Sequence, residues 1–125
     1  MRSGKLVLSP LAHTWVIDVD GTICMHNGYK SGEDKILPGV REFFSQIPPE
    51  DYILILTSRK SSARRRLVRF MRNHGLRYDK IVFDMPMGER ILINDDKPSG
   101  LNSSIAIRKK RDTPLDVSIC VDERL

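Results

Sequence analysis

The stretch that decides the fold is W-V-I-D-V-D-G-T, residues Trp15 to Thr22. Three apolar residues lead to the carboxylate of Asp18, and a second carboxylate, Asp20, follows two positions later. A short apolar run of this kind is typical of a strand in a parallel sheet that is covered on both faces. Because ligands bind beyond the carboxyl ends of such strands, we expect this strand to deliver both acids into a crevice. Gly21 then lets the chain turn without the steric penalty of a Cβ atom.

Two carboxylates at the end of a strand suit phosphoryl transfer. One carboxylate can attack phosphorus and form an aspartyl-phosphate. The other can protonate the leaving oxygen and then activate a water molecule. The alternative interpretation is an ordinary acidic turn after a strand, since Asp and Gly are common turn residues.

Size and composition indicate one domain, because the chain has 125 residues, of which 40% are hydrophobic and 30% are charged. No apolar run approaches the roughly 18 residues needed to span a membrane. The apolar patch near the N-terminus is too short for the core of a signal peptide. We therefore expect no membrane partner and a cytoplasmic location. Cys24 and Cys120 lack the spacing of metal ligands, so we expect reduced thiols.

The net charge of +5 comes largely from two basic clusters, one within residues 59–72 and one at residues 108–111. Such clusters attract nucleic acid or phosphorylated ligands. We prefer the interpretation of a solvated helix face and a basic loop. Nucleic acid is the less favoured partner, since no interleaved aromatic residues suggest a platform for stacked bases.

Apolar strands alternate with helical patterns along the chain. We expect strands at 13–19, 52–56, 80–83, 90–93 and 104–107, and helices at 38–47 and 61–74. This order predicts a single α/β domain over residues 1–125, a Rossmann-like three-layer sandwich with a mostly parallel sheet of about five strands. Three further segments complete the predicted domain: an N-terminal arm at 1–12, a flap or lid at 21–35, and a basic C-terminal loop and tail at 108–125. Within the arm, we expect an edge strand through residues 5–8. Within the tail, we expect residues 115–121 to form a strand or a helical turn.

Three of the predicted strands end in polar clusters. Asp18 and Asp20 follow the first, Thr57 and Ser58 follow the second, and Asp95 and Asp96 follow the strand at 90–93. The carboxyl ends of parallel strands meet at one edge of a sheet, so we expect these groups to converge there.

This pattern resembles the haloacid dehalogenase (HAD) superfamily. Its first motif, an apolar strand followed by D-x-D-G-T, matches Val16 to Thr22. Its second motif, a strand ending in Thr or Ser, matches Ile53 to Thr57, and its fourth, a strand ending in acids, matches Ile91 to Asp96. The helix start Leu37-Pro38-Gly39-Val40 is a frequent companion, and the resemblance covers about Trp15 to Ile107.

The resemblance implies a Mg²⁺-dependent phosphatase, a phosphomonoester hydrolase that acts through an aspartyl-phosphate. Asp18 would be the nucleophile, Asp20 the general acid and base, and Thr57 a ligand of the transferring phosphoryl group. The expected Mg²⁺ ligands are Asp18, Asp20, Asp95 and Asp96, and the expected phosphate-binding residues are Gly21, Thr22, Ser58 and Arg59. Several carboxylates at one edge repel each other and the phosphate, and Mg²⁺ would neutralise that charge through oxygen ligands.

The third motif of the family departs from its usual form here. The family places a Lys or Arg shortly before the fourth strand, but the comparable position holds Met85-Pro86. Lys80 and Lys97 are equal candidates to replace it, and Arg59 ranks behind them. If none of them serves, the alternative is a catalytically weakened phosphate-binding or interaction module with a HAD fold.

No gap between the motifs has room for a cap domain, so the site would be open and gated only by residues 21–35. Small members of this layout resemble phosphatases of surface-polysaccharide or sugar-phosphate metabolism, which implies a sugar phosphate, a nucleotide or a similar phosphorylated metabolite as substrate. Capless members tend to act on large substrates or to gain a lid by oligomerising. A polynucleotide phosphatase and a homo-oligomer therefore stay open as alternatives.

Overall fold

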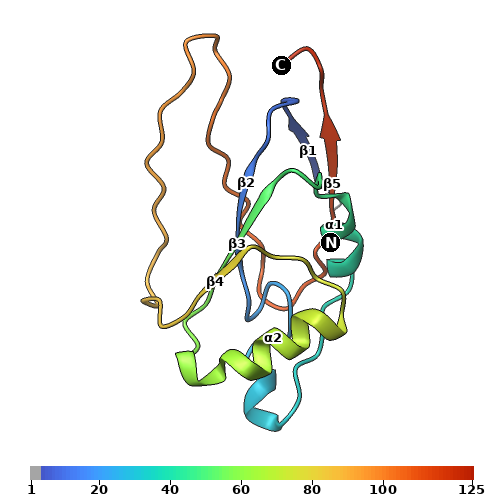
Figure 1. The fold of residues 1–125 in the computed structure, drawn as a ribbon, viewed down its shortest axis with the longest axis vertical. Helices are drawn as coiled ribbons and strands as arrows, with labels where there is room; N and C mark the ends of the chain where they lie inside the picture. Colours follow the sequence, from blue (N-terminus) through green and yellow to red (C-terminus); the bar gives the residue numbers. More distant parts are fainter. Residues whose placement is uncertain (1–3) are drawn as a thin grey trace.

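The computed structural model describes residues 4–125, except for the side chains of Tyr29 and Ser31. The first three residues of the predicted N-terminal arm lie outside this range. Five strands, two α-helices and two short 3₁₀ helices follow one another within residues 4–125 (Figure 1). Their bounds are β1 Gly4–Leu8, β2 Thr14–Asp18, η1 Gly28–Ser31, α1 Val40–Gln46, β3 Tyr52–Leu56, η2 Ser61–Ala63, α2 Arg64–Asn73, β4 Lys80–Val82 and β5 Val117–Val121.

The strands form two parallel sheets. One sheet has the order β2-β3-β4, and the other pairs β1 with β5 (Figure 1). The prediction of an α/β fold with parallel strands is confirmed, and so are the strand in the N-terminal arm and the strand near the C-terminus, but the arm strand is not an edge strand of the β2-β3-β4 sheet. The prediction of one sheet of about five strands is wrong, because β1 and β5 pair with each other and not with β2, β3 or β4.

One hydrophobic core joins the two sheets to the helices. Ile53 and Ile55 of β3 are fully buried, and they cluster with buried residues of β2, β4, α1, α2 and β5. Trp15 contributes an edge-on contact to Phe43 of α1, with ring centroids 5.6 Å apart. Apolar burial of this kind is the main favourable term in folding, so these contacts hold β2 and β3 in position against the helices.

The opposite face of the β2-β3-β4 sheet is partly open to solvent. Side chains alternate along a strand, so Ile17 points into the core while Val16 points away from it. Val16 is 55% exposed and Tyr52 is 44% exposed. The prediction that this strand is covered on both faces is therefore wrong.

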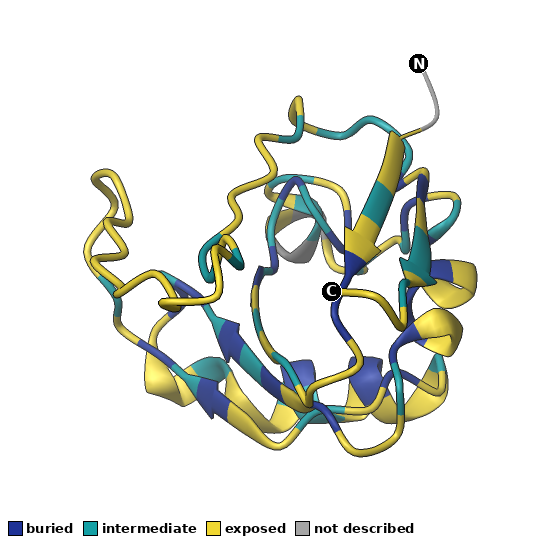
Figure 2. Cartoon of the chain, turned by 90° about the horizontal axis from the view of Figure 1, so that it is seen from above, coloured by how far each residue is buried: buried dark blue, intermediate teal, exposed yellow. Residues whose placement is uncertain are grey.

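Residues 83–116 contain no helix or strand and form a long, largely exposed loop, visible in Figure 2 as the arm that stands away from the body. The predicted strands at 90–93 and 104–107 are therefore wrong. The chain leaves the sheet at Asp84, which adopts a left-handed conformation with φ of 61°. The amides of Asp84 and Met85 donate to the carbonyls of Arg59 and Thr57, which turns the chain away from the sheet.

In the described range 4–125, no helix is long and apolar enough to cross a membrane.

Candidate functional site

The carboxyl ends of β2 and β3 lie side by side, because Asp18 is in register with Leu56. This register brings Asp18 and Thr57 to the same edge of the sheet, as predicted. The Asp18 side chain is 40% exposed. Its Oδ1 accepts a hydrogen bond from Nη1 of Arg90 at 2.8 Å, and its Oδ2 accepts one from the hydroxyl of Thr22 at 3.3 Å.

The chain turns sharply after β2. Gly21 has φ of 85°, in the left-handed region that favours glycine. Its amide donates to the carbonyl of Cys24 at 2.7 Å. Its own carbonyl accepts from Nζ of Lys109 at 3.0 Å and from the amide of Asp112 at 2.9 Å. Part of the C-terminal basic cluster therefore packs against this turn. Burial there lowers the pKa of Lys109, and the nearby Asp112 carboxylate opposes this effect.

Asp20 is held by Arg59, whose side chain is only 1% exposed. Nε and Nη2 of Arg59 donate to the two oxygens of Asp20 at 3.0 and 2.7 Å. The other side of the same guanidinium donates to Asp34, at 2.9 and 3.2 Å. Two carboxylates from separate segments therefore share one buried cation, an arrangement that fixes the flap at 21–35 against the loop after β3.

The two carboxylates decide the charge state of Arg59. Burial disfavours its positive charge, but the hydrogen bonds that Arg59 donates to Asp20 and Asp34 outweigh burial and raise the pKa of Arg59. Both oxygens of Asp20 accept hydrogen bonds from Arg59, and each carboxylate oxygen has a second lone pair that can accept from another donor.

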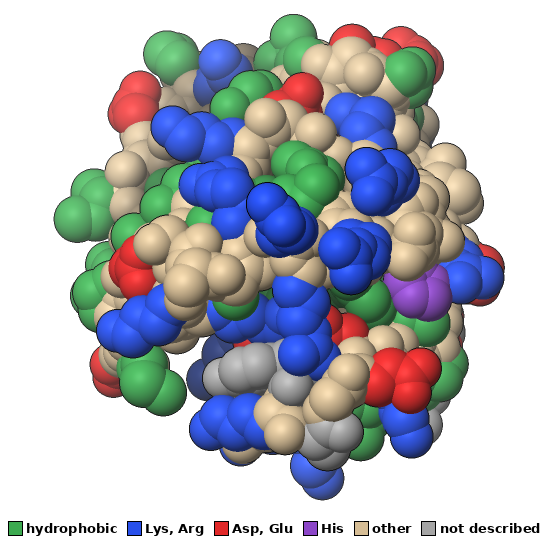
Figure 3. All heavy atoms as spheres, turned by 60° about the horizontal axis from the view of Figure 1, so that its bottom comes forward, with side chains coloured by type: hydrophobic (Ala, Val, Ile, Leu, Met, Phe, Trp, Pro, Cys, Tyr) green, Lys and Arg blue, Asp and Glu red, His purple; other side chains and the backbone are tan. Residues whose placement is uncertain are grey.

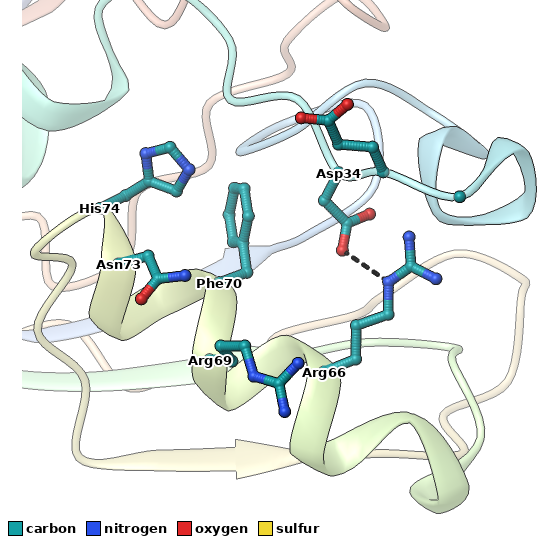
Figure 4. A pocket seen from close by; sticks show the side chains of 8 residues that line it. Asp34, Arg66, Arg69, Phe70, Asn73 and His74 are labelled. Carbon is teal, nitrogen blue, oxygen red and sulfur yellow. Dashed lines mark hydrogen bonds and ion pairs between the residues drawn. The ribbon is translucent and has the colours of Figure 1, made fainter.

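A surface pocket of about 260 Å³ lies between the flap and α2. Figure 4 shows Asp34 on one wall and Arg66, Arg69, Asn73 and His74 on the helix opposite it. Nε of Arg66 donates to Asp34 at 3.3 Å, which links this pocket to Arg59. Because Asp34 and its neighbour Glu33 also line the pocket, its charge is mixed.

Thr57 is predicted to bind a phosphoryl group, but its side chain is almost fully buried. Its hydroxyl accepts a hydrogen bond from the amide of Arg59 at 3.1 Å. Its role in this arrangement is to shape the loop that aims Arg59 at Asp20. The next residue, Ser58, is half-buried at the same edge.

The thiol of Cys24 lies within the same cluster. Its Sγ is 3.5 Å from Nη2 of Arg59 and 3.8 Å from Oδ1 of Asp20. Burial, assisted by the negative charge of Asp20, raises the pKa of Cys24 to about 12. The thiolate is the reactive form of cysteine, so we expect this thiol to react slowly at neutral pH.

The remaining predicted site residues do not join the cluster. Asp95, Asp96 and Lys97 are exposed on the 83–116 loop. The tip of this loop lies at the end of the molecule opposite to the carboxyl ends of β2 and β3 (Figure 1). Asp96 instead accepts a 3.4 Å hydrogen bond from the amide of Ser103 within the loop. Lys80 is exposed at the start of β4, away from the edge where Asp18 stands.

The predicted Mg²⁺ ligands therefore do not fit the ion in this arrangement. Within residues 4–125, no group of three His, Cys, Asp or Glu side chains lies close enough together to hold a metal ion. Asp18 and Asp20 are each engaged by an arginine. The physical reason is that the strand expected to bring Asp95 and Asp96 to the edge does not form.

Arg90 is the residue that the sequence interpretation missed. The three apolar residues that follow it predict a strand, whereas Arg90 extends from a loop and pairs with Asp18. Asp34 was missed as well, because nothing in its local sequence distinguishes it from other acidic residues of the flap. The cation beside Asp18 is thus Arg90, and not one of the three residues named as candidates, Lys80, Lys97 and Arg59.

No protein-family model, curated protein or solved structure matches the chain.

Proposed function

We propose that the protein is a phosphomonoester hydrolase in which Asp18 is the nucleophile, acting on a sugar phosphate, a nucleotide or a similar phosphorylated metabolite. One observation supports this proposal above the others. Asp18 stands partly exposed at the carboxyl end of a parallel strand, with the guanidinium of Arg90 2.8 Å from one of its oxygens. Such an edge is where α/β proteins place ligand sites, and arginine binds phosphoryl oxygens well.

In the first step, Oδ2 of Asp18 attacks phosphorus and forms the new P–O bond. The ester P–O bond breaks, and the leaving oxygen keeps its electron pair and takes up a proton. Arg90, beside Oδ1, offsets the negative charge on the phosphoryl oxygens as the bonds change. Asp20 is the proposed proton donor.

In the second step, a water molecule attacks the phosphorus of the aspartyl-phosphate. The bond between phosphorus and Asp18 breaks, inorganic phosphate leaves, and the carboxylate is restored. The proton lost by the water passes to Asp20, which is thereby ready for the next cycle.

Mg²⁺ is the cofactor that the HAD resemblance implies. Because the acids described above do not fit the ion, neither step is assigned to a metal. The involvement of Mg²⁺ is a separate proposal. It is tested by comparing the hydrolytic activity of the protein in the presence of Mg²⁺ with its activity in the presence of EDTA.

Hydrolysis of p-nitrophenyl phosphate tests the proposal. We expect turnover by the native protein and a loss of at least about 100-fold for Asp18→Asn, because the nucleophile is removed. The matched control is Asp116→Asn, an exposed carboxylate next to β5, which keeps full activity. Intact-mass analysis of an acid-quenched reaction should show one added phosphoryl group on the native chain. Equal hydrolysis by native protein and Asp18→Asn would remove Asp18 from the mechanism.

A second candidate is a phosphate-binding module without turnover. It is favoured by the pairing of both acids with arginines, since each carboxylate already has a cationic partner. It predicts that the native protein hydrolyses no substrate in a panel of phosphorylated metabolites. It also predicts that Asp18→Asn binds inorganic phosphate more tightly in calorimetry, because Arg90 is released from its partner.

A further inference from the structure

The outer face of α2 carries a row of arginines. Arg65, Arg69 and Arg72 follow one another at intervals of four and three residues, so their side chains project from the same side of the helix. All three are exposed. Figure 3, in which the end of the molecule that carries α2 faces the viewer, shows lysine and arginine side chains gathered on this face.

The charge of this row is not compensated. The helix sequence RRRLVRFMRN contains no acidic residue. In the part of the chain that the structure describes, no carboxylate lies within ion-pair distance of Arg65, Arg69 or Arg72. Arg66 differs, since it turns toward the flap and pairs with Asp34. The row is therefore available to an external anion.

We propose that this row binds the phosphodiester backbone of a nucleic acid without reading its base sequence. The helix rises about 1.5 Å per residue, so the row spans about 10 Å from Arg65 to Arg72. Successive phosphates of one DNA strand advance about 3.4 Å along the duplex axis, so this length covers enough phosphates for each of the three arginines to contact a separate one. The planar guanidinium group binds phosphate oxygens through two parallel hydrogen bonds, which suits this partner.

The apolar side of α2 argues against a lipid surface. A helix that lies on a membrane must direct large apolar side chains outward with its basic ones. Here Leu67, Phe70 and Met71 are buried in the core. The Phe70 ring is also covered by His74, with ring centroids 4.6 Å apart, so it offers no face to a base. Contacts from the row would therefore be to phosphates and not to bases.

This inference does not depend on the proposed hydrolase, because the row uses neither Asp18 nor Asp20. The binding experiment can be carried out with Asp18→Asn protein, which cannot form the aspartyl-phosphate. A failure of nucleic-acid binding and a failure of catalysis are then separate results.

The test is fluorescence anisotropy with a short labelled duplex DNA, a single strand of the same sequence, and an RNA duplex. Counterion release predicts a slope of about −3 for log K against log salt on duplex DNA when three phosphates are neutralised. The triple variant Arg65→Gln, Arg69→Gln, Arg72→Gln should bind at least about tenfold more weakly at low salt, with a flatter slope. Glutamine preserves helix propensity, and circular dichroism checks that the helix content is unchanged.

The control removes the same charge elsewhere, with Lys5→Gln, Arg108→Gln and Lys110→Gln, all exposed and outside α2. We expect it to bind nearly as tightly as the parent protein. Equal weakening by both triple variants would overturn the proposal, since net charge alone would then explain binding. Binding to vesicles of phosphatidylcholine and phosphatidylserine, with none to the duplexes or the single strand, would overturn it in favour of a membrane surface.

Discussion

Nδ1 of His13 lies 2.7 Å from Oδ2 of Asp51, and this pair ties the start of β2 to the turn that precedes β3. The Asp51 side chain is fully buried. It also accepts hydrogen bonds from the indole of Trp15 at 2.9 Å and from the amide of His13 at 3.0 Å. Burial opposes the charge on Asp51, but the bonds from Trp15 and His13 outweigh it and hold the pKa of this carboxyl below its usual value.

Asp51→Asn should lower the free energy of unfolding at neutral pH by about 2 kcal/mol, because it weakens charge-assisted hydrogen bonds. The contribution of a carboxyl with a lowered pKa is present above its unfolded pKa and is lost as the pH falls through its folded pKa. The difference between native protein and variant should therefore shrink below about pH 4. This difference in the free energy of unfolding is measured by urea unfolding, monitored through the fluorescence of Trp15, the single tryptophan. An unchanged midpoint at neutral pH would contradict this prediction, and the exposed Asp116→Asn is the control.

Arg59→Lys should destabilise the protein by about 3 kcal/mol, even though it keeps the positive charge. A single ammonium group cannot make paired hydrogen bonds to both Asp20 and Asp34, so at least one of these carboxylates loses its hydrogen bonds to the buried cation. Thermal unfolding measures the loss. The exposed Arg124→Lys, whose partner Asp122 is two residues away, is a matched control that we expect to be neutral. A neutral result for Arg59→Lys would mean that the shared guanidinium is not needed to hold the flap.

Arg90→Gln should reduce kcat/KM for p-nitrophenyl phosphate by about 10- to 100-fold, because one cation beside the phosphoryl oxygens is lost. The thermal midpoint should change little, since an ion pair this exposed contributes at most about 1 kcal/mol. Arg90→Lys should restore part of the activity. If Arg90→Gln lowered neither activity nor the affinity for inorganic phosphate, Arg90 would have no part in binding the phosphoryl group.

Cys24 should resist thiol reagents in the native protein, because burial and the charge of Asp20 raise its pKa to about 12. The partly exposed Cys120 should react. Titration with a disulfide reagent should therefore find one reactive thiol in native protein and two in guanidinium chloride. Cys120→Ala should abolish the native reaction, and Cys24→Ala should leave it unchanged. Comparable native rates for the two thiols would refute the assignment.

Gly39→Ala should destabilise the protein more than Gly75→Ala. Both glycines have left-handed backbone, with φ of 82° and 66°, so each substitution costs about 1–2 kcal/mol in backbone strain. A Cβ at Gly39 would also collide with the carbonyl oxygen of Leu115, whereas a Cβ at Gly75 would meet no neighbour within 4 Å. The overlap should add about 1–3 kcal/mol. Equal unfolding free energies for the two variants would contradict this prediction, since the backbone around Leu115 would then move away from the new Cβ without loss of stability.

Elements with a strong local pattern were predicted well. β3 spans Tyr52–Leu56 as expected, α1 and α2 fall within their predicted ranges, and Asp18 stands at the end of a parallel strand beside Thr57. Each of these elements combines a clear hydrophobic period with a glycine or proline near its boundary, and both signals are local.

The segment Ile91–Ile93 shows where local patterns fail. Its residues favour a strand, yet a strand also needs a partner, and partners are chosen by long-range packing. The same limit applies to the pairs of Asp34 with Arg59 and of Asp18 with Arg90, which join residues 25 and 72 positions apart. No short sequence window contains both members of such a pair.

The exposed run on the 83–116 loop has a consequence for the behaviour of the protein at high concentration. Ile91 and Ile93 are 83% and 92% exposed, with Leu92 between them and no charge to separate them. Exposed contiguous apolar residues favour contact with apolar surface on another molecule, including a second copy of the chain. The net charge of +5 keeps molecules apart, but only over the Debye length, which shrinks from about 30 Å at 0.01 M salt to about 10 Å at 0.1 M. Concentrated solutions should therefore become turbid as salt is added, and a single Ile93→Lys exchange on the loop should keep them clear.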